Sequence, residues 1–114
     1  MTDRDALAGF AALSHPVRLM LFRELASCAP QGVPAGQLAE RFDVPPSTMT
    51  GHLQSLERAG LLSSERRSRS ILYALNMTGA RSLVDYLVHD CCAGRSDICG
   101  PAGSVEPLAM QEAS

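Results

Sequence analysis

Three cysteines lie close together near the C-terminal end of this 114-residue chain, at positions 91, 92 and 99. Thiolates are soft ligands that prefer soft metals and metalloids. Because adjacent residues of an α-helix point about 100° apart, Cys91 and Cys92 can reach one ligand together only where their helix ends. Gly94 predicts such an end, and Cys99 would then fold back along the loop that follows. Cys91, Cys92 and Cys99 therefore predict a site for a thiol-preferring ion.

The chain has features of a cytoplasmic protein, in which thiols stay reduced. Residues 1–5 are charged and do not resemble a signal peptide, and no apolar run is long enough to span a membrane. Four cysteines in that compartment favour ligands or reactive thiols over structural disulfides. The fourth, Cys28, continues an apolar helical stripe and is predicted to be a buried core residue.

Length and charge indicate a single small domain with a basic body. Residues 1–81 hold nine arginines and seven acidic residues, whereas residues 82–114 hold one arginine and five acidic residues. A chain of this size buries a modest core, so a dimer would help to stabilise it. The basic body keeps nucleic acid open as a partner despite the formal net charge of -2.

Apolar spacing predicts five helices and two strands that would position these groups. The helices cover about residues 4–13, 16–28, 35–42, 46–59 and 78–91, with Ser14 and Thr78 as expected N-caps. Strands at 61–64 and 70–75 flank a polar hairpin tip at 65–69. The expected inward residues include Leu7 and Ala11 of the first helix, Met20, Leu21 and Leu25 of the second, and Met49, Leu53 and Leu56 of the fourth. This order predicts a mainly α (α+β) winged helix-turn-helix with a two-stranded wing.

The fourth helix and the hairpin carry side chains suited to DNA. Short hydroxyls, amides and imidazoles can approach base edges or phosphates, and arginines bind phosphates. The predicted DNA contacts are Ser47, Thr48, Thr50, His52 and Gln54 on the helix, and Arg66, Arg67 and Arg69 on the wing.

Three segments resemble the ArsR/SmtB family of bacterial metalloregulatory repressors. They are residues 12–21 (ALSHPVRLML), residues 46–53 (PSTMTGHL) with residues 59–62 (AGLL), and residues 66–75 (RRSRSILYAL). The resemblance covers about residues 5–92. It implies a homodimer, joined through the first and last helices, that represses its own operon. Gly51 stands where this family commonly has a larger side chain, and Ser68 replaces its usual wing glycine.

The thiol cluster resembles that of arsenic-responsive members of the family, which carry a vicinal pair and a third cysteine beyond the last helix. This resemblance implies repression of an arsenic-resistance operon, relieved when trivalent arsenic binds Cys91, Cys92 and Cys99. Antimonite is expected to bind as arsenite does, and methylarsenite needs only two thiolates. Two familiar inducer sites of the family are missing or poorly matched, because residues 35–42 hold no cysteine and Asp85 with His89 only partly fits the zinc pattern.

Other readings of the same residues stay open. His89 with the three cysteines could hold zinc, cadmium or lead, although zinc is less favoured than arsenic. A redox or sulfur sensor could pair Cys28 with Cys91 or Cys92. An enzyme is not expected, because the chain lacks a Cys-x-x-Cys motif in a βαβ unit and a Gly-rich phosphate loop. The division we expect is a DNA-binding and dimerisation domain at 1–92 and an inducer-binding loop with a flexible tail at 93–114.

Overall fold

The fold is a winged helix-turn-helix, as the sequence predicts. A computed structural model of the chain describes residues 1–91. The helices are α1 (Asp3–Leu13), α2 (Pro16–Ser27), α3 (Ala35–Phe42), α4 (Pro46–Arg58) and α5 (Met77–Asp85), and a π-helical segment, η1 (Tyr86–Cys91), continues α5. The strands are β1 (Val33–Pro34), β2 (Leu62–Arg67) and β3 (Ser70–Leu75). No helix in this part of the chain is long and apolar enough to cross a bilayer.

The wing is a longer hairpin than the sequence predicts. Cross-strand pairing continues to Arg67 and Ser70, so the tip consists of Ser68 and Arg69 rather than residues 65–69. Ser68 adopts the left-handed conformation, with φ of 53°, which a two-residue hairpin turn requires and which glycine adopts more easily. The residue that replaces the family's usual glycine therefore keeps the backbone conformation that a tight turn needs.

A third strand was not predicted. The sheet has the order β1-β3-β2 and is antiparallel throughout, with Val33 opposite Tyr73. Strand β1 is only two residues long and contains Pro34. It therefore has no alternating pattern, and its sequence is typical of a loop. It extends the sheet directly before α3 and thereby joins the wing to the helix-turn-helix.

The core lies between the helix-turn-helix and the base of the wing. Its fully buried side chains are Leu21, Leu25, Leu38, Met49, Leu53 and Leu56, with Leu61, Leu62 and Tyr73 close to full burial. These positions agree with the predicted stripes of α2, α3 and α4. Met20 and Leu7 were predicted to face inward, but their side chains are 52% and 67% exposed. Helix α1 instead buries its small residues Ala6, Gly9 and Ala12, and Ala11 is exposed.

Both predicted N-caps are displaced by one or two residues. His15, not Ser14, caps α2, because its Nδ1 accepts a hydrogen bond from the Val17 amide at 3.1 Å. Asn76, not Thr78, caps α5, because its Oδ1 accepts from the Gly79 amide at 3.2 Å. Asparagine is among the strongest N-caps, and the imidazole of His15 supplies an acceptor that a propensity argument does not consider.

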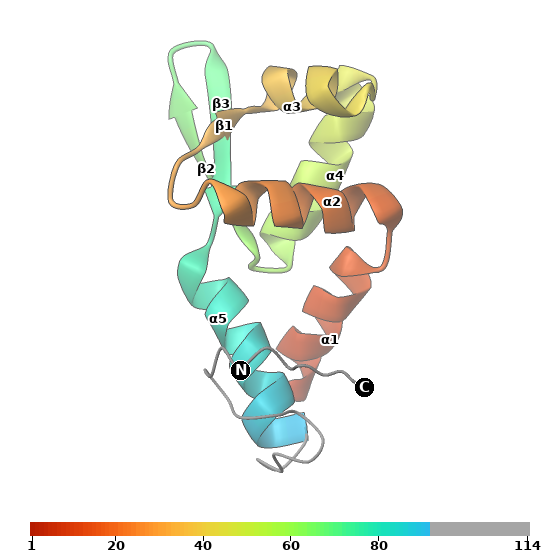
Figure 1. The fold of residues 1–114 in the computed structure, drawn as a ribbon, viewed down its shortest axis with the longest axis vertical. Helices are drawn as coiled ribbons and strands as arrows, with labels where there is room; N and C mark the ends of the chain where they lie inside the picture. Colours follow the sequence, from red (N-terminus) through yellow and green to blue (C-terminus); the bar gives the residue numbers. More distant parts are fainter. Residues whose placement is uncertain (92–114) are drawn as a thin grey trace, which may run out of the picture.

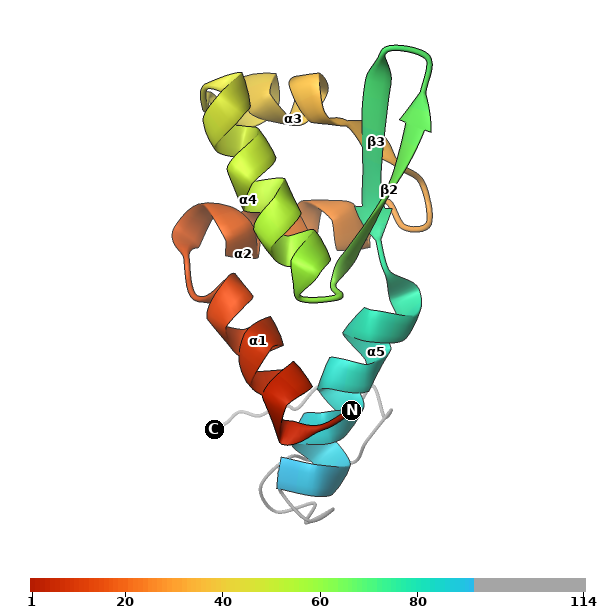
Figure 2. The ribbon, with the colours of Figure 1, turned by 180° about the vertical axis from the view of Figure 1, so that it is seen from behind.

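Helices α1 and α5 form one end of the molecule, opposite the wing tip (Figures 1 and 2). Gly9 lets them approach closely, since a Cβ there would lie 3.2 Å from Cδ2 of Leu83. Tyr86 of η1 donates a hydrogen bond to Oδ1 of Asp3 at 2.7 Å, and its ring lies 6.5 Å from that of Phe10. The single helix expected over 78–91 is therefore an α-helix, α5, that continues directly into the π-helical segment η1. Tyr86 of η1 holds this segment against α1.

We predict that Gly79→Ala destabilises the fold. A Cβ at position 79 would overlap the carbonyl oxygen of Gly60, a backbone atom fixed by the turn after α4. Overpacking of this kind costs about 1–3 kcal/mol, and urea unfolding measures it. Gly51→Ala is the matched control, because the space around Gly51 is open and alanine favours a helix interior by up to about 1 kcal/mol. Equal effects of the two variants would contradict the close approach.

Candidate functional site

Helix α4 separates sharply into a buried face and an open face. Met49, Leu53 and Leu56 are fully buried. The opposite stripe, at spacings of three and four residues, is exposed and consists of Ser47, Gly51, Gln54 and Arg58. The side chain of Gly51 is a hydrogen and nothing lies within 4 Å of its Cβ position, so the middle of this stripe is open. This face can approach a groove of DNA without a change in the fold.

The predicted contacts on α4 do not all lie on that open face. Ser47, Thr48 and Gln54 are exposed, whereas Thr50 and His52 are half-buried at its margins. Arg58 was not predicted as a contact, although it continues the stripe of Ser47, Gly51 and Gln54 by one more turn. The helical spacing alone could have identified it.

His52 is engaged with α2. Its Nδ1 accepts a hydrogen bond from Nε of Arg18 at 3.2 Å, and its ring centroid lies 4.6 Å from that of His15, with 49° between the ring planes. Burial, followed by the nearby charges of His15 and Arg18, lowers the pKa of His52 below its ordinary value of 6.5. The neutral imidazole is therefore the form that fits this position.

The wing presents the predicted basic cluster. Arg66, Arg67 and Arg69 are exposed, and Nε of Arg67 pairs with Glu65 at 3.1 Å. The base of the wing is tied to α4, since Oγ of Ser64 donates to the carboxylate of Glu57 at 2.6 Å. The hairpin tip and the first turn of α4 lie at the same end of the molecule (Figure 1), so the arginines and the open stripe can face one duplex.

Comparisons with known proteins agree with this geometry. Residues 13–65 match the family model described as a helix-turn-helix domain. The biofilm growth-associated repressor of Agrobacterium fabrum is 32% identical over 87 residues, which are 75% of this chain and 71% of the repressor. An ArsR-like transcriptional regulator from Rhodococcus sp. RHA1 has 26% identity and a TM-score of 0.66, over 79% of this chain and 81% of the regulator. The chain belongs to the ArsR family of transcriptional repressors.

A further structural neighbour shares the fold of this ArsR-family repressor. It is the homodimeric winged helix-turn-helix domain of a Mycobacterium bovis protein, with 21% identity, a TM-score of 0.62, and coverage of 77% of this chain and 85% of that domain. Because these relatives are a repressor and a transcriptional regulator, and the matched family model is a helix-turn-helix domain, the prediction that the chain is not an enzyme is confirmed. The comparisons also confirm DNA as a partner, without identifying the operator sequence.

The thiol cluster lies almost wholly outside the described residues. Cys91 is the last residue of η1, while Cys92, Cys99 and the predicted tail at 93–114 are not described. Within residues 1–91 no group of three His, Cys, Asp or Glu side chains could hold a metal ion. Asp85 ends α5 and His89 lies in η1, and both are exposed. The predicted ligand set of the repressor remains a prediction.

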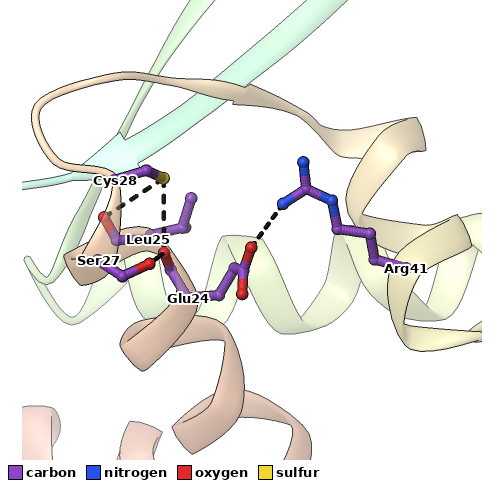
Figure 3. Close-up of polar contacts among 5 residues, drawn as sticks. All are labelled: Glu24, Leu25, Ser27, Cys28 and Arg41. Carbon is purple, nitrogen blue, oxygen red and sulfur yellow. Dashed lines mark hydrogen bonds and ion pairs between the residues drawn. The ribbon is translucent and has the colours of Figure 1, made fainter.

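Cys28, by contrast, has a structural place at the C-cap of α2 (Figure 3). It packs against the core as predicted, but it is half-buried rather than buried, and its thiol donates to the carbonyl oxygen of Glu24 at 3.4 Å. The end of α2 lies beside the sheet, far from the end of η1 (Figure 1).

We predict that Arg58→Ala weakens operator binding by the repressor. The variant loses one exposed cation on the open face of α4, so the slope of log affinity against log salt should fall by about 1. Fluorescence anisotropy at several salt concentrations measures both quantities. Arg4→Ala removes the same charge from the first turn of α1, at the opposite end of the molecule, and should leave the slope unchanged. Identical slopes for all three proteins would remove Arg58 from the interface.

The position of His52 also predicts a pH-dependent stability. Because the folded-state pKa lies below 6.5, the unfolded chain takes up the proton first as the pH falls. The free energy of unfolding should therefore decrease from about pH 6.5 downward, until the folded protein is protonated as well, and be flat with respect to this group above pH 7.5. Urea unfolding at pH 7.5, 6.5 and 5.5 measures the decrease, and His52→Asn should reduce it. A decrease of equal size in that variant would assign it to other groups.

Proposed function

We propose that this chain is a homodimeric, cytoplasmic repressor of an arsenic-resistance operon that leaves its operator when trivalent arsenic binds Cys91, Cys92 and Cys99. The observation that carries the proposal is the concentration of three thiols in residues 91–99, directly after the helix that packs on α1. Three thiolates match the preference of a soft, three-coordinate metalloid. Antimonite has the same preference and is a second inducer.

The dimer is supported by apolar side chains that the single chain leaves exposed. Leu7 on α1, with Val84 and Leu87 on α5 and η1, is 41–67% exposed. Exposed apolar patches commonly mark interfaces between proteins, and these belong to the two helices at the end away from the wing. The Mycobacterium bovis neighbour is itself homodimeric. In such a dimer two α4 helices would enter successive major grooves, about 34–36 Å apart.

In this proposal, Tyr86 transmits a conformational change at the thiols to the DNA-binding helix. Its hydroxyl is bonded to Asp3 and its ring packs near Phe10, so a change at the end of η1 acts on α1. Helix α1 leads through Ser14 into α2, against which α4 packs. Binding of the metalloid would thereby alter the pose of the two α4 helices in the dimer. Allosteric coupling typically amounts to about 1–3 kcal/mol, a 5- to 150-fold change in affinity.

Titration of arsenite into the full-length repressor bound to DNA from upstream of its own gene tests the proposal. We expect the operator dissociation constant to rise about tenfold or more, as read by fluorescence anisotropy under reducing conditions. Cys91→Ser, Cys92→Ser and Cys99→Ser should each bind DNA normally and lose most of the response. Cys28→Ser is the matched control, since serine can also donate to the carbonyl of Glu24, and it should respond as the wild type does.

The same titration separates the rival inducers. Zinc, cadmium and an oxidant are added in parallel to the wild-type protein and to the four variants. Release by zinc or cadmium alone, or by the oxidant alone, would keep the repressor and overturn the arsenic site. A full arsenite response in Cys91→Ser or Cys92→Ser would overturn the assignment of the ligands.

A further inference from the structure

His15, Arg18 and His52 form a small polar cluster between α2 and α4 that the proposed arsenic response does not involve. His15 caps α2 through Nδ1, Arg18 lies in the first turn of the same helix, and His52 extends from the margin of α4. The bond from Nε of Arg18 to Nδ1 of His52 joins residues 34 positions apart in the sequence. It is a direct polar link between α4 and the helix that supports it.

Both imidazoles use Nδ1 as an acceptor, which requires that this nitrogen carry no proton. His52 accepts from Arg18, and His15 accepts from the amide of Val17 at 3.1 Å. Protonation of His52 would turn the acceptor into a donor and place a second positive charge against the guanidinium of Arg18. Acid therefore opposes the bond that joins Arg18 of α2 to His52 of α4.

Among residues 1–91, no carboxylate forms a hydrogen bond or ion pair with His52 or Arg18. Arg58, further along α4, lines a shallow groove with Arg18 and the alanines of α1. The nearby carboxylates of α2 and α4 have other partners, since Glu24 pairs with Arg41 of α3 and Glu57 accepts from Ser64 of β2. The charges that act on His52 are those of His15 and Arg18, and both disfavour its protonation.

We propose that His52 is a positioning residue whose neutral imidazole fixes α4 against α2, so that mild acid weakens operator binding by the repressor. The inference needs only the DNA-binding function of the family and is independent of the thiol ligand. The pH dependence that we propose is opposite to that of a direct contact between His52 and DNA. If His52 bound a phosphate, protonation would strengthen the contact, and affinity would rise as the pH falls.

Operator affinity of the full-length protein between pH 7.5 and 5.5, without metalloid, tests the proposal at constant ionic strength. His52→Asn places an amide oxygen near the position of Nδ1 and cannot be protonated. We expect the wild-type dissociation constant to rise about fivefold or more over this range relative to the His52→Asn variant.

His52→Ala gives a second readout, because it removes the acceptor at every pH. It should bind the operator more weakly than the wild type at pH 7.5 and lose the pH dependence that His52 contributes, while thermal unfolding confirms that it is folded. Wild-type affinity that rises in acid, a pH dependence unchanged in His52→Asn, or normal binding by His52→Ala at pH 7.5 would each overturn the proposal.

Discussion

The burial of one face of α4 is the constraint on which the rest of the structure depends. Met49, Leu53 and Leu56 are fully enclosed, and each such side chain contributes about 1.5–3 kcal/mol when it leaves water. This burial fixes the rotation of α4 about its axis. The stripe from Ser47 to Arg58 is left facing outward as a direct consequence, beside a wing whose base is tied to α4 through Ser64 and Glu57.

The sequence predicts this part of the fold well because its signals are local and periodic. The stripe of α4, the end of that helix at Gly60, with φ of 84°, and the apolar residues of α3 all follow from spacing. The N-caps are less predictable, because several neighbouring polar side chains compete for the same amides. Strand β1 was missed for another reason: two residues that pair with a distant strand carry no pattern of their own.

The outward positions of Leu7 and Met20 show a different limit. Periodicity indicates that an apolar residue belongs to a stripe, but it does not say whether the partner is the same chain or another molecule. His52 is a similar case, because its residue type suits a DNA contact and its position on the helix is marginal. Only the three-dimensional arrangement brings it to Arg18 and His15, which lie 34 and 37 positions earlier in the chain.

Helices α1 and α2 connect the two ends of the molecule. One end holds the wing tip and the first turn of α4, and the other holds the N-terminal part of α1 with α5 and η1 (Figure 2). Between them, α1 is joined to η1 through Tyr86 and leads into α2, which His15 caps and whose first turn carries Arg18. In the mechanisms we propose, both the thiols and His52 would act on DNA binding by changing how α4 packs against α2.

The most direct test of this account is amide chemical-shift mapping of the isotope-labelled repressor with its operator duplex. The account predicts the largest shifts at Ser47, Gly51, Gln54 and Arg58 and along residues 66–69, with small shifts in α1. Large shifts confined to α1 and α5, with α4 and the wing unchanged, would contradict it.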